Sequence, residues 1–370
     1  MPQNFSDISR FVNKAVITEE VEHFVPEYSF SDFKLEALLR KNIEAKGYVT
    51  PTPIQDRSIP HILRGEDIVG IANTGTGKTA AFLIPLINKI MLDPREKVLI
   101  VVPTRELANQ IDEELRVFAK NSNLFSVLCI GGTGMGKQIR ELRYSHHFVI
   151  GTPGRLKDLM EQQVLNLSGF KTVVLDEADR MLDMGFVNDM RFMMSKMPPV
   201  RHTLFFSATI SPEIEKLIHE FLREPVRISV KTQDTAKNVH QDIVKIPVGK
   251  IKIDVLEGLL RDKDFSKVLV FGRTKHGVEK LSTELGKRGF KTESIHGNKS
   301  QSQRQRSLDL FKRDHAQVLI ATDVAARGLD ISSVTHVINF DLPATYDDYV
   351  HRIGRTGRAG QSGKALTFIT

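Results

Sequence analysis

The sequence has little of several features on which other classes of protein depend. A single cysteine, Cys129, among 370 residues excludes an internal disulfide framework and an all-cysteine metal site. No apolar run approaches the roughly 20 residues of a transmembrane helix, and the N-terminus has no basic segment followed by an apolar stretch. We therefore predict no membrane span and no secretory signal, and we expect a monomer in the cytoplasm.

Aromatic residues are also scarce, since tryptophan is absent and tyrosine occurs only 5 times. A large aromatic platform for reading nucleic-acid bases is therefore not expected. Basic charge is present instead, with a net charge of +7 and a pI of about 9.3. A basic surface attracts polyanions such as nucleic acid, although the charge can also serve solubility alone. If nucleic acid binds, the expected contacts are to its sugar-phosphate backbone.

Short apolar runs alternate with helical stretches along most of the chain. Such runs are typical of strands in a parallel sheet that is covered by helices on both faces. We therefore predict an α/β fold with two tandem doubly wound parallel-sheet domains. The predicted strands are Ile68–Ala72, Val98–Val102, Ser126–Ile130, Phe148–Ile150, Thr172–Leu175 and Thr203–Phe206, then Val268–Phe271, Thr292–Ile295, Val318–Ala321, His336–Asn339 and Ala365–Ile369.

The predicted domain boundaries follow changes in this pattern. Residues 1–28 show no clear period and are interpreted as an N-terminal extension, and residues 29–230 form the first domain. Residues 231–238 are polar and aperiodic, which is typical of a linker. Residues 239–370 form the second domain.

A glycine-rich loop follows the first predicted strand and opens a helix. It contains Gly75-x-Gly77-Lys78-Thr79, with Ala72 where a strict phosphate-loop pattern has glycine. Glycines let backbone amides approach phosphate oxygens, and the helix N-terminus adds a positive dipole. Lys78 is predicted to neutralise the β- and γ-phosphates, and the Thr79 hydroxyl is predicted to bind Mg²⁺.

Two carboxylates follow the strand Thr172–Leu175, at the end of the strand where open α/β sheets bind ligands. Asp176 suits the water shell of Mg²⁺. Glu177 is placed to orient and deprotonate an attacking water.

Residues 176–179 read Asp-Glu-Ala-Asp, and about a dozen motifs over residues 30–370 occur in the order of one family. The chain resembles the DEAD-box family of superfamily 2 helicases. The resemblance implies two RecA-like lobes, ATP and Mg²⁺ as cofactors, RNA as a partner, and possible protein partners.

The resemblance assigns the nucleotide-binding residues. Gln55 in the segment 47–55 would read the edge of adenine, because its amide both donates and accepts hydrogen bonds. Phe30 could stack on the base, and Phe33 competes for that role. The full predicted ATP set is Phe30, Gln55, Thr74, Gly75, Thr76, Gly77, Lys78, Thr79 and Asp330.

The same resemblance assigns residues to RNA phosphates and to catalysis. Arg355 and Arg358 would act as arginine fingers that join Lys78, Asp176 and Glu177 when the two lobes close. Arg273 follows Gly272, which departs from the commoner polar pair of the family. The predicted RNA set is Pro103, Thr104, Arg105, Gly132, Thr152, Arg155, Arg273, Gln301, Arg304 and Thr322, and the predicted coupling set is Asp179, Ser207, Thr209 and His351. In the coupling set, the resemblance implies that the hydroxyls of Ser207 and Thr209 bond to Asp179 across the strand tips.

The predicted function is an ATP-dependent RNA helicase that opens short duplexes locally or remodels RNA–protein complexes. An ATP-gated RNA clamp with slow turnover, or a DNA-directed helicase, would carry the same motifs. Several of the short motifs, such as Ser207-Ala208-Thr209, could also serve as helix caps.

Overall fold

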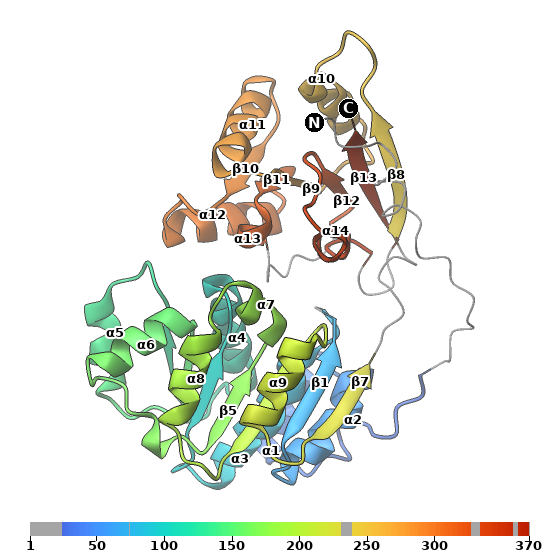
Figure 1. The fold of residues 1–370 in the computed structure, drawn as a ribbon. Helices are drawn as coiled ribbons and strands as arrows, with labels where there is room; N and C mark the ends of the chain where they lie inside the picture. Colours follow the sequence, from blue (N-terminus) through green and yellow to red (C-terminus); the bar gives the residue numbers. More distant parts are fainter. Residues whose placement is uncertain (1–23, 74, 231–238, 327–333, 358–361, 370) are drawn as a thin grey trace. The chain divides into compact units, whose positions relative to one another are not determined.

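The computed structural model describes residues 24–369 apart from 74, 231–238, 327–333 and 358–361 (Figure 1). The described residues form two compact units, residues 24–230 and residues 239–369. Each unit is described by itself below. In the described part of the chain, no helix combines the length and the apolar character that a membrane crossing requires.

The first unit is built on a sheet of 7 strands in the order β3-β4-β2-β5-β6-β1-β7, and its neighbouring strands are parallel. The strands are β1 (Ile68–Ala72), β2 (Val98–Val101), β3 (Ser126–Cys129), β4 (Phe148–Gly151), β5 (Thr172–Leu175), β6 (His202–Ser207) and β7 (Val226–Val230). The helices are α1 (Ala37–Ala45), α2 (Pro53–Leu63), α3 (Lys78–Leu92), α4 (Arg105–Phe118), α5 (Met135–Leu142), α6 (Pro153–Glu161), α7 (Ala178–Asp183), α8 (Val187–Ser195) and α9 (Pro212–Phe221), with a 3-10 turn at Leu167–Gly169.

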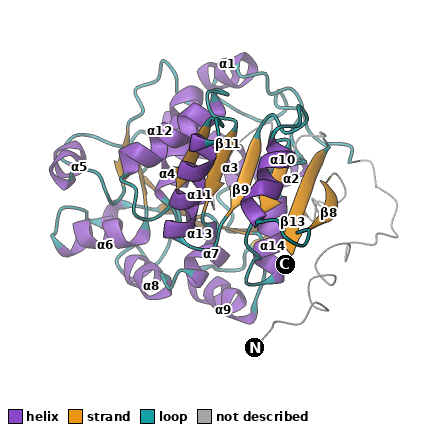
Figure 2. Cartoon of the chain, turned by 90° about the horizontal axis from the view of Figure 1, so that it is seen from above, coloured by secondary structure: helices purple, strands orange, loops and turns teal. Residues whose placement is uncertain are grey.

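Helices cover both faces of this sheet (Figures 1 and 2). Successive strand residues point to opposite faces, so Ile100 belongs to a core with α1–α4 while Leu99 belongs to a core with α5–α9. The central strands are buried on both faces, which explains their continuous apolar sequences. Cys129 ends β3 and is fully buried.

The second unit has the same architecture on a sheet of 6 parallel strands in the order β10-β11-β9-β12-β13-β8. Helices α12 and α13 share a core with Leu269, and α10 and α11 share a core with Val268 on the opposite face. The strands are β8 (Val239–Lys245), β9 (Val268–Phe271), β10 (Thr292–Ile295), β11 (Val318–Ala321), β12 (His336–Asn339) and β13 (Gly363–Ile369), and the helices are α10 (Lys252–Leu260), α11 (Lys275–Lys287), α12 (Gln301–Lys312), α13 (Asp323–Ala326) and α14 (Tyr346–Ile353).

The predicted fold class is confirmed, and every predicted strand is present with ends that agree within about two residues. Two strands were missed, β7 and β8. Both lie at the edge of a sheet and carry exposed residues such as Arg227 and His240. An edge strand covered on one face lacks the continuous apolar run by which the other strands were recognised.

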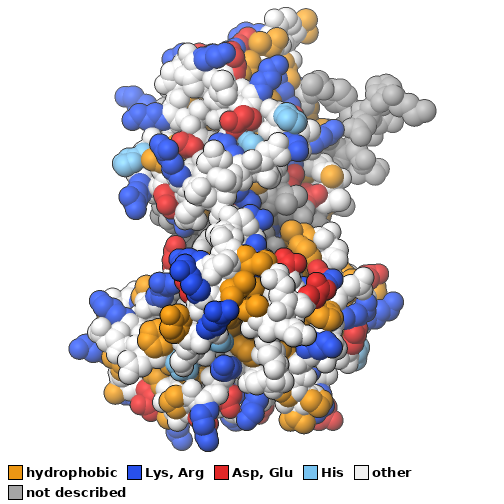
Figure 3. Space-filling model, turned by 90° about the vertical axis from the view of Figure 1, so that its left-hand side faces the viewer, with side chains coloured by type: hydrophobic (Ala, Val, Ile, Leu, Met, Phe, Trp, Pro, Cys, Tyr) orange, Lys and Arg blue, Asp and Glu red, His pale blue; other side chains and the backbone are white. Residues whose placement is uncertain are grey.

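Charge is distributed broadly over each unit. Figure 3 shows Lys and Arg side chains spread over the visible face of both units rather than collected in one patch. The net charge of +7 therefore does not by itself mark a binding surface on that face.

Candidate active site

The loop after β1 has the backbone of a phosphate-binding loop. Gly75 and Gly77 have φ angles of +86° and +93°, which residues other than glycine rarely adopt. Helix α3 begins at Lys78, so its free amides and the positive end of its dipole lie at this loop. Lys78 is buried, and its Nζ donates to the carbonyl of Ala72 at 2.6 Å and to that of Asn73 at 3.1 Å. The loop therefore wraps around the ammonium group that is predicted to face the phosphates.

The two described threonines of this loop lie in different surroundings. The Thr76 hydroxyl donates to the Asn73 carbonyl at 2.8 Å and so stabilises the loop. Thr79 lies half-buried in the first turn of α3, one residue after Lys78. The first turn is the position from which a hydroxyl can reach a metal bound beside the loop.

Gln55 links helix α2 to the phosphate loop. Its side chain is buried, Oε1 accepts from the backbone amide of Thr52 at 2.9 Å, and Nε2 donates to the Gly77 carbonyl at 3.1 Å. A Cβ at Gly77 would lie 2.5 Å from this Nε2, so the contact requires glycine there. An amide oxygen accepts two hydrogen bonds and an amide nitrogen donates two. One acceptor position on Oε1 and one donor position on Nε2 therefore remain for adenine.

Phe30, the predicted stacking residue, is 4% exposed and lies in the core of the first unit. Its ring meets Phe33 and Tyr48 edge-on, with centroids 5.9 and 5.7 Å apart. The neighbouring backbone amide of Tyr28 donates to Asp56, beside Gln55, at 2.9 Å. The segment before Phe30 is thus tied to α2, while stacking of either phenylalanine on a base stays a prediction.

Asp176 and Glu177 leave the end of β5, at the sheet edge where the phosphate loop also lies, and both are buried. Burial raises the pKa of Asp176 to about 6, the Lys78 charge opposes that rise, and the Glu177 charge adds to it. A bound divalent cation would lower the pKa of Asp176 again, because it favours the ionised carboxylate. In the described part of the chain, no group of three or more His, Cys, Asp or Glu side chains could hold a metal. The Asp176 carboxylate and the Thr79 hydroxyl are oxygen donors of the kind that Mg²⁺ takes in proteins, and water and phosphate would supply its other ligands.

Asp179 joins the strand tips of β5 and β6. Its Oδ2 accepts from the amides of Ala208 and Thr209, at 3.1 and 3.0 Å, and from the Thr209 hydroxyl at 3.1 Å. The expected contact between Thr209 and Asp179 is confirmed. For Ser207 the expectation was wrong, because its hydroxyl donates to the Thr209 carbonyl at 2.7 Å. Ser207 therefore shapes the loop that presents Thr209.

The predicted RNA motifs of the first unit follow β2, β3 and β4, which are neighbours in the sheet. The Arg105 guanidinium lies against Gly131 and Gly132, where a Cβ on either glycine would collide with it. Gly132 has a φ angle of +75°, so this close approach and the backbone both require glycine. Pro103 is buried, and the Thr104 hydroxyl caps α4 by accepting from the Leu107 amide at 3.3 Å.

A glutamine that sequence reasoning missed connects the loops after β3 and β4. Gln138 on α5 is buried, and its Nε2 donates to the Ile130 carbonyl at 2.8 Å and to the Thr133 hydroxyl at 2.5 Å. Its Oε1 accepts from Arg155 at 3.0 Å. Thr152 lies half-buried at the N-cap of α6, three residues before Arg155. The structure thus brings Arg155 and the glycine loop together through Gln138.

In the second unit, Arg352 holds the end of α14, just before the predicted arginine finger Arg355. Its guanidinium pairs with both oxygens of Asp323, at 2.6 and 2.8 Å, and donates to the Asp341 carbonyl at 2.6 Å. Arg355 is 5% exposed, and its Nε donates to the His351 carbonyl at 3.3 Å. Sequence reasoning missed both Arg352 and Asp323.

The predicted RNA residues of the second unit lie in the segments that follow β9, β10 and β11 along the chain. The Arg273 side chain is exposed, and its backbone amide donates to Asp341 at 2.8 Å. Gln301 begins α12 and is 6% exposed, yet neither atom of its amide has a hydrogen-bond partner in the described structure. Arg304, one turn further on, and Thr322, after β11, are half-buried. The amide of Gln301 is therefore buried with its hydrogen-bonding capacity unused in the described structure.

Comparison with known proteins identifies the family. The family model described as DEAD/DEAH box helicase matches residues 52–217, and that described as helicase conserved C-terminal domain matches residues 251–360. The DEAD-box ATP-dependent RNA helicase CshA of Bacillus licheniformis is 45% identical over 344 residues, covering 92% of this chain and 70% of CshA. The chain belongs to the DEAD/DEAH box helicase family.

Solved structures of DEAD-box proteins have the same fold. A DEAD-box protein from Methanococcus jannaschii is 38% identical, with a TM-score of 0.55 and coverage of 92% of this chain and 93% of that one. Dbp5 of S. cerevisiae, solved with RNA and ADP BeF3, is 29% identical, with a TM-score of 0.81 and coverage of 92% and 89%. The predicted RecA-like architecture is therefore confirmed for this DEAD-box chain.

Three predicted DEAD-box site residues lie outside the described residues. They are Thr74 in the phosphate loop, Asp330 at the predicted ribose position and Arg358, the second predicted finger. Most of the predicted N-terminal extension and the whole of the predicted linker, residues 231–238, lie outside them as well. The roles of all these positions stay predictions.

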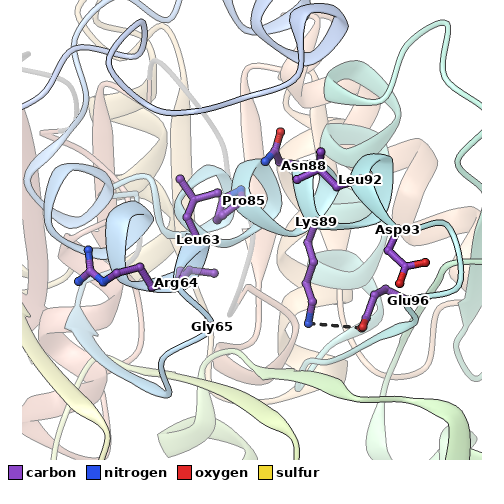
Figure 4. Close-up of a pocket in the computed structure, with 10 residues that line it drawn as sticks. Leu63, Arg64, Gly65, Pro85, Asn88, Lys89, Leu92, Asp93 and Glu96 are labelled. Carbon is purple, nitrogen blue, oxygen red and sulfur yellow. Dashed lines mark ion pairs between the residues drawn. The ribbon is translucent and has the colours of Figure 1, made fainter.

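A pocket of about 360 Å³ lies away from all predicted DEAD-box site residues (Figure 4). It is formed by the C-terminal parts of α2 and α3 and by the loop that follows, and the Lys89–Glu96 ion pair, at 3.3 Å, lies on its wall. Lys89 is 11 residues from Lys78, or about 16 Å along α3. The volume of this pocket therefore says nothing about nucleotide binding, which depends on the loop at the other end of the helix.

Proposed function

We propose that this member of the DEAD/DEAH box family is an ATP-dependent RNA helicase that opens short RNA duplexes locally or remodels RNA–protein complexes. The observation that carries the proposal is the edge of the first sheet, where Lys78, Asp176 and Glu177 lie buried beside a phosphate-binding loop. The relatives agree with it, since CshA is named an ATP-dependent RNA helicase and Dbp5 was solved with RNA and ADP BeF3.

In this proposal the first unit binds ATP. The amides around Gly75 and Gly77 and the Lys78 ammonium hold the phosphates, while Gln55 reads adenine. Thr79 and Asp176 would hold Mg²⁺, Asp176 largely through water, and the ion would neutralise charge on the phosphates. The stacking partner is Phe30, and Asp330 takes the ribose.

Hydrolysis then divides between the two units. Glu177 orients the attacking water and takes its proton. Arg355 and Arg358 stabilise the charge that develops on the transferred phosphoryl group, a contribution of about 10³–10⁵ in rate where arginine fingers have been measured. Because these arginines belong to the second unit, hydrolysis requires the two units to close on each other.

RNA is bound through its backbone and promotes this closure. The arginines, hydroxyls and glycine amides of the predicted RNA set suit phosphate oxygens, so we expect little sequence specificity and a preference set by the 2′-hydroxyl. ATP and RNA each stabilise the closed form, and each therefore tightens binding of the other. Asp179, Thr209 and His351 couple phosphate release to release of the strand.

We also propose the domain boundaries given above, with residues 29–230 as the ATP-binding lobe, residues 231–238 as the linker and residues 239–370 as the second lobe. A monomeric state and a cytoplasmic location belong to the same proposal, and protein partners are compatible with it.

The test is ATP turnover and duplex unwinding, each measured with single-stranded RNA, with DNA of the same sequence and without nucleic acid. We expect RNA to stimulate turnover, and we expect Glu177→Gln to lower it by about 10²–10⁴-fold. Glu161→Gln, an exposed glutamate at the end of α6, is the control and should retain wild-type turnover. Undiminished turnover in Glu177→Gln would refute the proposal, and RNA-stimulated turnover without unwinding would indicate a clamp.

A further inference from the structure

Arg180 is buried at the nucleotide edge of the first sheet without a role in any predicted motif. It lies in the first turn of α7, directly after residues 176–179, and its exposure is only 5%. Arginine is seldom buried unless its charge is paired. The surroundings of Arg180 therefore need an explanation.

The guanidinium of Arg180 forms an ion pair with Glu177, through Nη1 and the Oε2 atom. Both side chains are almost fully buried. The backbone amide of Arg180 donates to Asp179 Oδ1 at 3.0 Å and to the Glu177 carbonyl at 3.0 Å. One residue thus contacts both the predicted water-activating acid and the acid that binds the β6 tip.

The local backbone places these groups together. Glu177 has a φ angle of +52°, in the left-handed region, and it occupies the position just before the first residue of α7. Residues three apart on a helix are neighbours on its surface, so the carboxylate of Glu177 and the side chain of Arg180 meet. Ala178 and Met181 anchor the same turn in the core. Arg180 therefore approaches Glu177 from a fixed element rather than from a mobile loop.

The ion pair does not satisfy the hydrogen-bonding capacity of the arginine. A guanidinium carries five N–H donors, yet Nε and Nη2 of Arg180 are buried without a partner in the described structure. An arginine kept for stability alone would be expected to fill these donors, because buried unpaired donors destabilise the fold. The arrangement therefore favours a role in holding Glu177.

We infer that Arg180 is a positioning residue for ATP hydrolysis, which holds the Glu177 carboxylate in the orientation that accepts the proton of the attacking water. The inference rests on the proposed function of Glu177. Arg180 acts only through Glu177 and does not contact the nucleotide in this scheme.

Two substitutions separate charge from geometry. Arg180→Gln removes the charge, and we expect it to lower kcat for RNA-stimulated ATP hydrolysis about tenfold, since small misplacements of catalytic groups are costly. The KM for ATP and the RNA concentration for half-stimulation should be unchanged. Arg180→Lys keeps the charge without the planar fork, so kcat should be partly restored.

The deciding experiment is a double-mutant cycle with Glu177→Gln, read by single-turnover hydrolysis over long incubations. If Arg180 acts through Glu177, Arg180→Gln should reduce the rate about tenfold in the wild type and have little further effect beside Glu177→Gln. Equal reductions in the two backgrounds would overturn the inference, as would a changed KM for ATP with unchanged kcat.

Controls keep the outcomes distinct. Arg191→Gln breaks an exposed pair with Glu220, 3.0 Å long, and should leave kcat unchanged. Thermal unfolding shows whether each variant is folded, and if Arg180→Gln does not fold, the same cycle is run with Arg180→Lys. A wild-type chain without RNA-stimulated ATPase would refute the proposed function itself, whereas normal wild-type activity with a fully active Arg180→Gln would refute this inference alone.

Discussion

His336 shows how strongly one residue can respond to its surroundings. It begins β12, is 3% exposed, and stacks on Phe265 with ring centroids 3.8 Å apart. Its Nδ1 lies 3.0 Å from the Thr335 hydroxyl. Burial, with a smaller effect of the Lys364 charge, lowers the pKa of His336 from 6.5 to about 4.

This lowered pKa predicts a loss of stability in acid. The unfolded chain binds a proton at His336 near pH 6.5, whereas the folded chain binds it only near pH 4. The contribution of neutral, buried His336 to the stability of the fold is therefore fully present above pH 6.5, and it is lost as the pH falls from there toward 4. We expect the free energy of unfolding to fall by about 1–2 kcal/mol from this group, after solvent screening is allowed for.

Urea unfolding of the wild type and of His336→Asn, at several pH values from neutral down to about 5, measures this effect. The variant is expected to be less stable at neutral pH but to depend less on pH. His146, His147 and His202 also have lowered pKa values caused by burial, so the difference between the two proteins isolates His336. Parallel pH profiles would contradict the prediction.

At the scale of residues, motifs predict which side chains take part but not what they bind in the folded chain. The sequence indicated Lys78 and Asp179, and the structure supplies their partners in the loop and in the β6 tip. Arg180 could have been found, because an acid and a base three apart at a helix start predict an ion pair. Gln138 and Arg352 could not, since their partners Arg155 and Asp323 lie 17 and 29 residues away along the sequence.

At the scale of elements, the loops after neighbouring strands act together. Gln138 on α5 holds the β3 loop through the Ile130 carbonyl and the Thr133 hydroxyl, and holds Arg155 on α6 through its own oxygen. Loss of this side chain would release both the β3 loop and Arg155, which carry predicted RNA contacts. The phosphate loop follows β1, several strands away in the sheet, and should not be affected.

We therefore predict that Gln138→Ala weakens binding of single-stranded RNA about five- to tenfold, the equivalent of roughly one hydrogen bond. ATP binding in the absence of RNA should be unchanged. Filter binding with a non-hydrolysable ATP analogue measures the first quantity and calorimetry the second. Gln162→Ala is the matched control, because among the described residues the Gln162 side-chain amide hydrogen-bonds only to the Met135 sulfur, at 3.3 Å. Equal RNA affinities for both variants would contradict this account.

The strands that are buried on both faces, such as β2 and β5, were predictable from sequence. Their apolar runs are too short for a helix and are rich in β-branched residues, which together indicate a buried strand. The edge strands β7 and β8 were not, since exposed polar residues interrupt the apolar run in both of them. Their strand character depends on pairing with β1 and β13, which local sequence does not encode.

At the scale of the whole molecule, each unit contains its own hydrophobic cores. The two cores of the first unit draw their residues from positions 30–230, and those of the second from positions 239–368. Units with complete cores are expected to fold alone.

We predict that residues 24–230 and residues 239–370, produced separately, each unfold in a cooperative thermal transition. Neither should hydrolyse ATP at more than about 1% of the RNA-stimulated rate of the whole chain, because the acids and the arginine fingers are then on different molecules. Calorimetry and a phosphate-release assay measure these two outcomes. Full turnover by the first fragment would show that the arginines of the second unit are dispensable.

The burial of Cys129 at the end of β3 has a practical consequence. Because burial raises the pKa of its thiol to about 12, the group stays protonated and out of reach of alkylating reagents at neutral pH. New cysteines at Val49 and Val248, which are 78% and 106% exposed, one in each unit, would then be the reactive positions for maleimide dyes. Distance changes between Val49 and Val248 can thus be measured by fluorescence energy transfer without replacing Cys129.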